Sequence, residues 1–329
     1  MKIIRKYFLP FLLVFIVVAG GTFAAIKLFD SRKSQTNNLA TEEDTTIEEP
    51  VPDPIPDFID LQPVVDEWVS EVGSSVSVAI YDLDNDRFAA LHNANLIRRP
   101  ASLYKLFYIY DAYKAIDAGI DNPDDIYINL GGSRGQTTIW QCLEIMVSES
   151  NNACAEAMLG EDLRDERVAA WIAELGLTGT ASTGLETTAA DLVEVLKMYY
   201  YHPDWSETSY AAWQFSALEP ATNGTDYRKG LPSGFNEATV YNKVGWQNST
   251  GNWEIYNDAA LVEFTNLEIP RHYIVVVMTG TGILERYTRG DYVGFNNISR
   301  LGAMLEDAIL NYGVIDDAEP YLDAGSELE

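Results

Sequence analysis

The stretch that decides the fold runs from residue 100 to residue 107 and reads PASLYKLF. Apolar residues continue at helical spacing through Tyr110, so the stretch predicts the start of a buried helix. A serine at such a start is ordinarily a cap, and a lysine one turn later is ordinarily a solvated charge. The alternative is chemical, because Lys105 lies one turn from Ser102 on the same helix face, within reach of its hydroxyl. Other parts of the chain have to decide between the two interpretations.

Strand patterns lie on both sides of a helix-rich middle. They occupy four runs: a hairpin pattern at 75–92 and single strands at 238–246, 257–264 and 272–280. Amphipathic helices are predicted at 61–73 and 297–313, and several more from about 137 to 201. Strands from both ends of the chain then have to share one sheet. The predicted fold is α+β, an antiparallel sheet flanked by helices with an inserted all-helical subdomain at about 120–225.

The N-terminus predicts a membrane anchor or a secretory signal. Lys2, Arg5 and Lys6 precede an uncharged run at 7–26 that is long enough to span a bilayer. The residues TFA before Ala25 also fit a cleavage site. We favour an uncleaved signal-anchor in the cytoplasmic membrane, with the domain outside the cell membrane. Secretion after signal cleavage is the alternative.

Composition sets the predicted boundaries. Residues 1–33 are the predicted signal-anchor, and 34–59 are an acidic, proline-rich linker typical of an extended tether. A globular domain at 60–314 and an acidic tail at 315–329 follow. The formal net charge of -28 would repel phosphates, so nucleic acid is not an expected partner. We expect a monomer.

The chain has two cysteines, Cys142 and Cys154. Both lie in apolar helical patterns, so we expect two buried free thiols, although an oxidising compartment would allow a disulfide. The three histidines, His92, His202 and His272, lack metal-ligand spacing. We therefore expect no metal and no cofactor.

Three polar elements follow one another along the domain. They are Ser102-Leu103-Tyr104-Lys105, Ser150-Asn151-Asn152 and Lys243-Val244-Gly245. Their order resembles the Ser-x-x-Lys, Ser-Asp-Asn and Lys-Thr-Gly set of class A β-lactamases and penicillin-binding proteins. The resemblance covers about residues 60–313, since the next helix and the next strand also follow in the family's order. It implies the β-lactamase fold and a serine hydrolase that forms an acyl-enzyme.

The resemblance also implies a role for each polar residue. Ser102 would be the nucleophile, and Lys105 would take its proton if burial or a cation such as Lys243 depressed the lysine pKa. Ser150 would pass a proton to the leaving nitrogen, while Asn152 would bind the substrate amide and steady Lys105. Lys243, on an inner strand, would attract a substrate carboxylate.

Backbone N–H groups of Ser102 and Trp246, beside Gly245, would form the oxyanion hole. Two positions depart from the family pattern. Asn151 replaces an aspartate that braces the turn, and because asparagine keeps an acceptor oxygen we expect the turn to survive. Val244 replaces a threonine or serine, so a hydroxyl that helps to bind the substrate carboxylate is missing.

The stretch TGTASTGLE at 178–186 is a third departure, since class A β-lactamases have a longer loop there with a water-activating glutamate. Glu186 is its only carboxylate, and it is either a helix N-terminal charge or that base. We therefore expect a β-lactam to label the protein and to leave slowly.

Two classes of function remain. The first is a hydrolase of β-lactams or of D-alanyl-D-alanine-like amides in peptidoglycan stem peptides. The second is a catalytically silent relative that binds cell-wall peptide or a partner, which Val244 and the short loop motivate. The joint presence of Ser102, Lys105 and the other polar residues favours the hydrolase.

Overall fold

The computed structural model describes residues 56–201, 230–249, 253–279 and 293–312. The chain divides after Asp53 into two units, and all of these residues belong to the second unit. The predicted signal-anchor, most of the predicted linker and the acidic tail lie outside the described residues. Within the four ranges, no helix combines the length and the apolar character that crossing a membrane requires.

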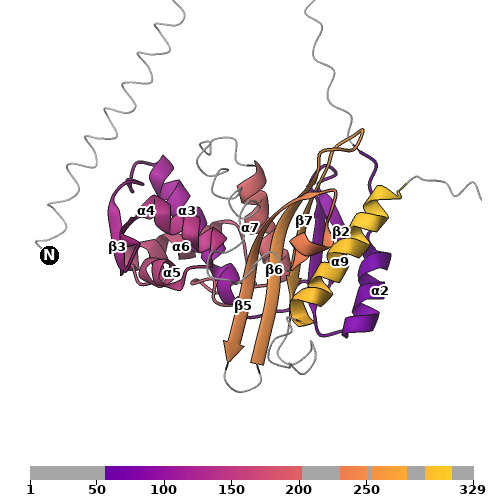
Figure 1. Ribbon diagram of the computed structural model, residues 1–329, viewed down its shortest axis with the longest axis horizontal. Coiled ribbons are helices and arrows are strands. Elements are labelled where there is room, and N and C mark those ends of the chain that lie inside the picture. Colours follow the sequence, from indigo (N-terminus) through magenta and orange to yellow (C-terminus); the bar gives the residue numbers. More distant parts are fainter. Residues whose placement is uncertain (1–55, 202–229, 250–252, 280–292, 313–329) are drawn as a thin grey trace, which may run out of the picture. The chain divides into compact units, whose positions relative to one another are not determined.

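A five-stranded antiparallel sheet with the order β2-β1-β7-β6-β5 forms the centre of the domain (Figure 1). Its strands are β1 (Ser77–Asp82), β2 (Arg87–His92), β5 (Thr239–Ser249), β6 (Trp253–Phe264) and β7 (Arg271–Met278). Strand β1 pairs with β2 on one side and with β7 on the other. The predicted joining of strands from both ends of the chain is therefore confirmed. Every residue of β1 is buried, as expected for a strand covered on both faces.

Two helices from opposite ends of the domain cover one face of the sheet: α2 (Gln62–Val72) and α9 (Val293–Leu310) (Figure 1). Trp68 of α2 is fully buried, and its indole N–H donates to the carbonyl oxygen of Asn297 on α9 at 2.8 Å. A long-range hydrogen bond thus joins the first helix of the domain to the last one.

The other helices of the described residues lie beyond the opposite face: α3 (Lys105–Asp117), α4 (Ile139–Ser148), α5 (Asn152–Leu159), α6 (Asp162–Glu174) and α7 (Ala189–Tyr201). Helix α7 packs on β1 and β7, while α3 to α6 extend to one side as a subdomain (Figure 1). Phe107 of α3 stacks on Trp171 of α6 with ring centroids 5.5 Å apart. These helices therefore share a hydrophobic core that is separate from the core beneath α2 and α9.

The subdomain is not all-helical, so that prediction is wrong. Strands β3 (Ile126–Gly131) and β4 (Gly135–Thr138) form an antiparallel hairpin within it. No residue of β3 is fully buried. The run IYINL at 126–130 is rich in β-branched and aromatic residues and is followed by glycines, which is the strand signal that sequence reasoning missed.

The prediction of two free thiols is also wrong. Cys142 of α4 and Cys154 of α5 form a disulfide with Cα atoms 5.4 Å apart. Both residues are fully buried, as their apolar surroundings indicated. A turn was expected at this place, but the local pattern does not show that it folds α5 back against α4, which is what brings the two sulfurs together.

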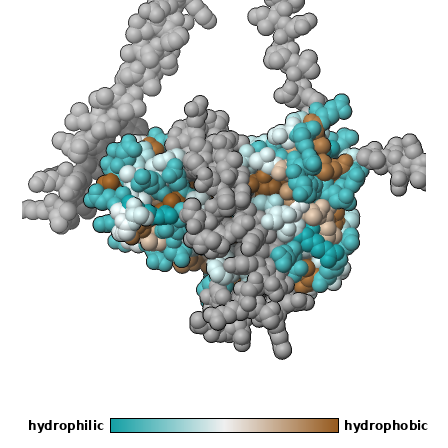
Figure 2. Space-filling model, viewed as in Figure 1, coloured by the Kyte–Doolittle hydropathy of each residue, from teal (hydrophilic) through white to brown (hydrophobic). Residues whose placement is uncertain are grey.

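The described surface in Figure 2 is largely hydrophilic, with apolar residues scattered among polar ones. Single apolar side chains scattered in this way are normal on protein surfaces.

Candidate active site

Ser102 lies in η2 (Ala101–Tyr104), a short 3-10 helix that continues directly into α3. Ala101 has a φ of 48°, a left-handed conformation that side chains with a Cβ disfavour. The neighbouring backbone is held from the sheet, because Asn257 Nδ2 on β6 donates to the carbonyl oxygen of Arg99 at 3.0 Å. The sequence did not reveal this supporting role of Asn257, which there is only the first residue of the strand pattern at 257–264.

Lys105 is the centre of the site and is fully buried. Its Nζ lies within hydrogen-bond distance of four oxygens: Ser102 Oγ at 3.1 Å, Ser150 O at 2.7 Å, Ser150 Oγ at 3.1 Å and Asn152 Oδ1 at 2.7 Å. Burial lowers the pKa of Lys105 from 10.5 to about 8, against an opposing effect of the Glu156 charge. About one tenth of the amine is then neutral at pH 7, so Lys105 can accept the proton of Ser102.

The turn between α4 and α5 carries the second polar element. Asn151 Oδ1 accepts the backbone N–H of Cys154 at 3.1 Å, so asparagine does brace the turn, as expected. Ser150 has a φ of 54°, again in the left-handed region. Its hydroxyl lies between two amines, 3.1 Å from Lys105 Nζ and 2.9 Å from Lys243 Nζ.

Lys243 projects from β5 and is almost completely buried, and its Nζ also donates to the carbonyl oxygen of Val244 at 2.8 Å. The prediction that Lys243 lies on an inner strand is wrong, because β5 forms one edge of the described sheet. Burial lowers the pKa of Lys243 well below its usual value, and the charge of Lys105 lowers it further. Burial, rather than a neighbouring cation, is what depresses Lys105.

Gly245 lets β5 pass close to the turn that carries Ser102. A Cβ on Gly245 would lie 2.2 Å from the carbonyl oxygen of Pro100, so no other residue fits without moving the strand. Val244 points to the opposite face and is buried in the core beneath α2 and α9, away from a substrate beside Lys243. The side chain of Trp246 packs against the same core, and the oxyanion role of its N–H stays a prediction.

Glu186 is exposed on the loop at 178–186. Its carbonyl oxygen accepts the N–H of Ala181 at 2.8 Å, which closes the loop. Within the described part of the chain, its carboxylate makes no hydrogen bond or ion pair, so the structure does not bring it into contact with Ser102 or Lys105. The base role considered for Glu186 therefore gains no support from these contacts.

Asp258 of β6 is a buried acid that sequence reasoning missed. Its Oδ1 accepts from Asn242 Nδ2 and its Oδ2 from the N–H of Leu231, both at 2.8 Å. Burial raises the pKa of Asp258 to about 7, and its charge favours the protonated form of Lys243. An aspartate within an otherwise apolar strand pattern was the signal that could have identified it.

Comparisons with known proteins agree with this fold. A model of the "Beta-lactamase enzyme family" matches residues 60–305. No curated protein matches the chain. A β-lactamase from Chitinophaga pinensis DSM 2588 is 19% identical with a TM-score of 0.60, covering 74% of this chain and 97% of that one. A class A β-lactamase from Bacteroides cellulosilyticus DSM 14838 is 16% identical with a TM-score of 0.61, covering 76% and 98%.

A β-lactamase from Burkholderia vietnamiensis is 16% identical with a TM-score of 0.60, and covers 76% of this chain and 97% of that one. At such identities the solved structures show the shared fold, and the family model shows the relationship. The predicted α+β fold and the resemblance to serine β-lactamases are confirmed. The chain belongs to the β-lactamase enzyme family and is a serine hydrolase that acts on amide bonds.

Proposed function

We propose that the protein is an exported acyl-serine hydrolase whose substrate presents an amide carbonyl beside a carboxylate. β-Lactams and the D-alanyl-D-alanine-like ends of peptidoglycan stem peptides both have this arrangement. The observation that supports the proposal is the buried amine of Lys105, 3.1 Å from Ser102 Oγ, with its pKa lowered to about 8.

The contacts support one order of acylation steps. Neutral Lys105 accepts the hydroxyl proton of Ser102 while Oγ attacks the carbonyl carbon. Ser150 Oγ, between the two lysines, then delivers its proton to the leaving nitrogen and takes in its place the proton held by Lys105. The carbon–nitrogen bond breaks and an ester on Ser102 remains.

Lys243 supports recognition of an anionic substrate. A carboxylate that binds beside it favours its charged form, because the opposite charge raises a lysine pKa. The charge of Lys105 disfavours the protonated form of Lys243, so a proton that a bound carboxylate fixes on Lys243 favours the neutral, basic form of Lys105. Substrate binding would thus prepare the base.

The N-terminal run supports placement of the domain outside the cytoplasmic membrane, anchored by one span, with secretion as the alternative. A domain placed there reaches peptidoglycan directly. The alternative of a silent binding relative rests on Val244 and the short loop. The two buried lysines around Ser150 make a silent binding protein the weaker proposal, because binding alone does not require two amines with depressed pKa values.

A labelling experiment tests the proposal. The purified full chain is incubated with a fluorescent penicillin, and mass spectrometry locates the adduct. We expect it on the peptide that contains Ser102, and we expect Ser102→Ala to remain unlabelled.

Ser148→Ala is the matched control, because its hydroxyl bonds within α4, to Glu144 O at 2.8 Å, and should leave labelling unchanged. A Ser102→Ala protein that is labelled at the wild-type rate would contradict the proposal, as would a wild-type protein that neither a penicillin nor an activated D-alanyl ester labels.

A further inference from the structure

Glu156 lies on α5, one turn beyond Asn152, and belongs to none of the three polar elements of the sequence. We infer that Glu156 is the catalytic base that activates the water which hydrolyses the acyl ester on Ser102. The inference rests on the proposed function, since it concerns the second half of the same reaction.

The position of Glu156 follows from helix geometry. Residues four apart on a helix are neighbours on its surface, with Cβ atoms about 5 to 6 Å apart. Asn152 and Glu156 are both exposed, and Asn152 Oδ1 accepts from Lys105 Nζ at 2.7 Å. Glu156 therefore lies on the strip of α5 that borders Lys105.

The charge of Glu156 shifts the pKa values of two residues close to Ser102 in the chain. It raises the pKa of Lys105, against the larger effect of burial. It also adds to burial in raising the pKa of Tyr104, which lies between Ser102 and Lys105 in the chain. The protonation of two adjacent residues in the turn that follows Ser102 thus depends on the same carboxylate.

The carboxylate of Glu156 is available to water. Among residues of the four described ranges, it makes no hydrogen bond and no ion pair, and it is exposed. Glu149, on the other side of Ser150, is instead held by Arg134 at 2.6 Å. Glu186 is not among the charges that shift the pKa of Lys105. Glu156 is thus the carboxylate that combines nearness to Lys105 with free lone pairs.

The step balances with water as the only co-reactant. Glu156 takes one proton from water while the water oxygen bonds to the ester carbon. The bond from that carbon to Ser102 Oγ then breaks, and the proton held by Glu156 returns to Ser102 Oγ through neutral Lys105. The products are a carboxylic acid and the free serine, so the enzyme is restored.

The experiment separates acylation from deacylation. The full chain and its Glu156→Gln and Glu186→Gln variants are labelled with fluorescent penicillin, the free label is removed, and the decay of bound label is followed. We expect Glu156→Gln to label within about threefold of the wild-type rate and to lose label at least about 100-fold more slowly, the scale of a lost general base. Glu186→Gln, which changes the same group on the loop, should decay within about threefold of wild type.

A second readout distinguishes this role from a structural one. Removing the Glu156 charge lowers the pKa of Lys105 further, so the acylation rate of Glu156→Gln should reach its plateau at a lower pH than that of wild type. Glu156→Asp keeps the charge and should restore part of the decay.

Decay at the wild-type rate in Glu156→Gln would overturn the inference, and so would decay that stops in Glu186→Gln instead. Wild-type label that never decays would also overturn it while leaving the proposed function intact. Failure of the wild-type protein to take up label would contradict the proposed function itself, so the two failures are distinguishable.

Discussion

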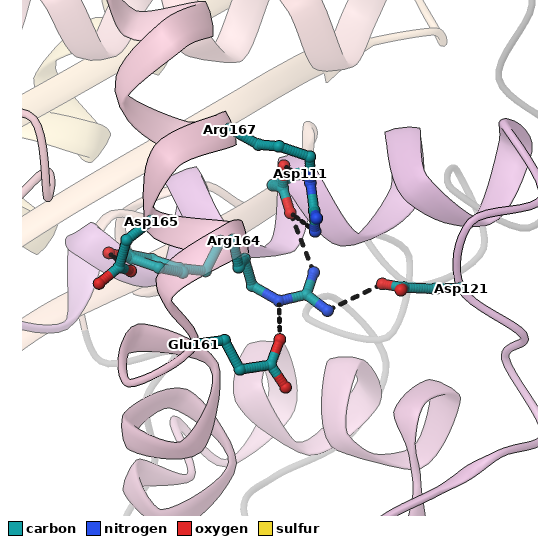
Figure 3. Close-up of polar contacts among 7 residues, drawn as sticks. Asp111, Asp121, Glu161, Arg164, Asp165 and Arg167 are labelled. Atoms are coloured by element: carbon teal, nitrogen blue, oxygen red, sulfur yellow. Dashed lines mark hydrogen bonds and ion pairs between the residues drawn. The ribbon is translucent and has the colours of Figure 1, made fainter. Parts of the chain in front are cut away.

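Two groups of buried charge in this domain are built in opposite ways. In the helical subdomain, Arg164 of α6 donates to Asp111, Asp121 and Glu161, at 3.0, 2.8 and 3.0 Å (Figure 3). At the active site, Lys105 and Lys243 converge on one serine hydroxyl, and neither forms an ion pair with a carboxylate of the described residues.

The pKa values of these buried cations differ in the same way as their surroundings. Burial opposes the charge of Arg164, but hydrogen bonds and charges from its three carboxylates outweigh burial and raise its pKa. At the lysines the charges of Glu156 and Asp258 oppose burial only in part, and burial lowers the pKa of Lys105 and of Lys243. The difference teaches that a buried cation surrounded by carboxylates is fixed in its charged form, whereas one surrounded by neutral oxygens can lose its proton and react.

Breaking the Arg164 cluster should have the largest effect. Arg164→Ala leaves the buried carboxylate of Asp111 with only Arg167, so we expect the free energy of unfolding to fall by about 3 kcal/mol or more. Urea unfolding measures the change. Arg300→Ala is the control, because its ion pair with Glu71 is largely exposed and should contribute less than about 1 kcal/mol. Equal losses in the two variants would show that burial of the cluster does not matter.

The disulfide stabilises the active-site turn by a covalent link instead of charge. Cys142→Ala combined with Cys154→Ala removes a cross-link across a sequence separation of 12 residues, and we expect a loss of about 2 to 3 kcal/mol in unfolding free energy. Thermal unfolding with and without a reductant checks this value. If the reductant leaves the unfolding of the wild-type protein unchanged, the bond does not contribute at this scale.

At the active site the same kind of truncation should affect rate more than stability. Lys105→Ala removes the base that lies 3.1 Å from Ser102 Oγ, so acylation should slow about 100-fold or more. The circular dichroism spectrum should stay that of a folded chain. Stopped-flow labelling measures the rate, and unchanged acylation would make Lys105 a purely structural residue.

The smallest expected effect is the pH response of acylation. Because the pKa of Lys105 is lowered to about 8, its neutral fraction falls about tenfold for each pH unit below that value. The acylation rate should therefore rise tenfold per unit up to about pH 8 and level off above it. A rate that continues to rise to pH 10 would indicate a lysine with an ordinary pKa.

Much of the active site could be predicted because its chemistry is local. Ser102 and Lys105 are one helical turn apart, and Asn151 caps the helix that follows it, so their geometry depends on few other residues. The expected slow deacylation depended on Glu186 as the one candidate base. Glu156 was missed because nothing in its own surroundings marks a surface glutamate on a helix as close to a lysine 51 positions earlier in the chain.

The sequence by itself determined the helix starts, the strand patterns and the order of the three polar elements, because these depend on spacing within single segments. Only the tertiary structure decided the disulfide, the edge position of β5 and the depressed pKa of Lys105. The physical reason is that burial and long-range pairing are properties of the packed chain. Where a side chain is buried, and which charges surround it, is fixed only when distant segments meet.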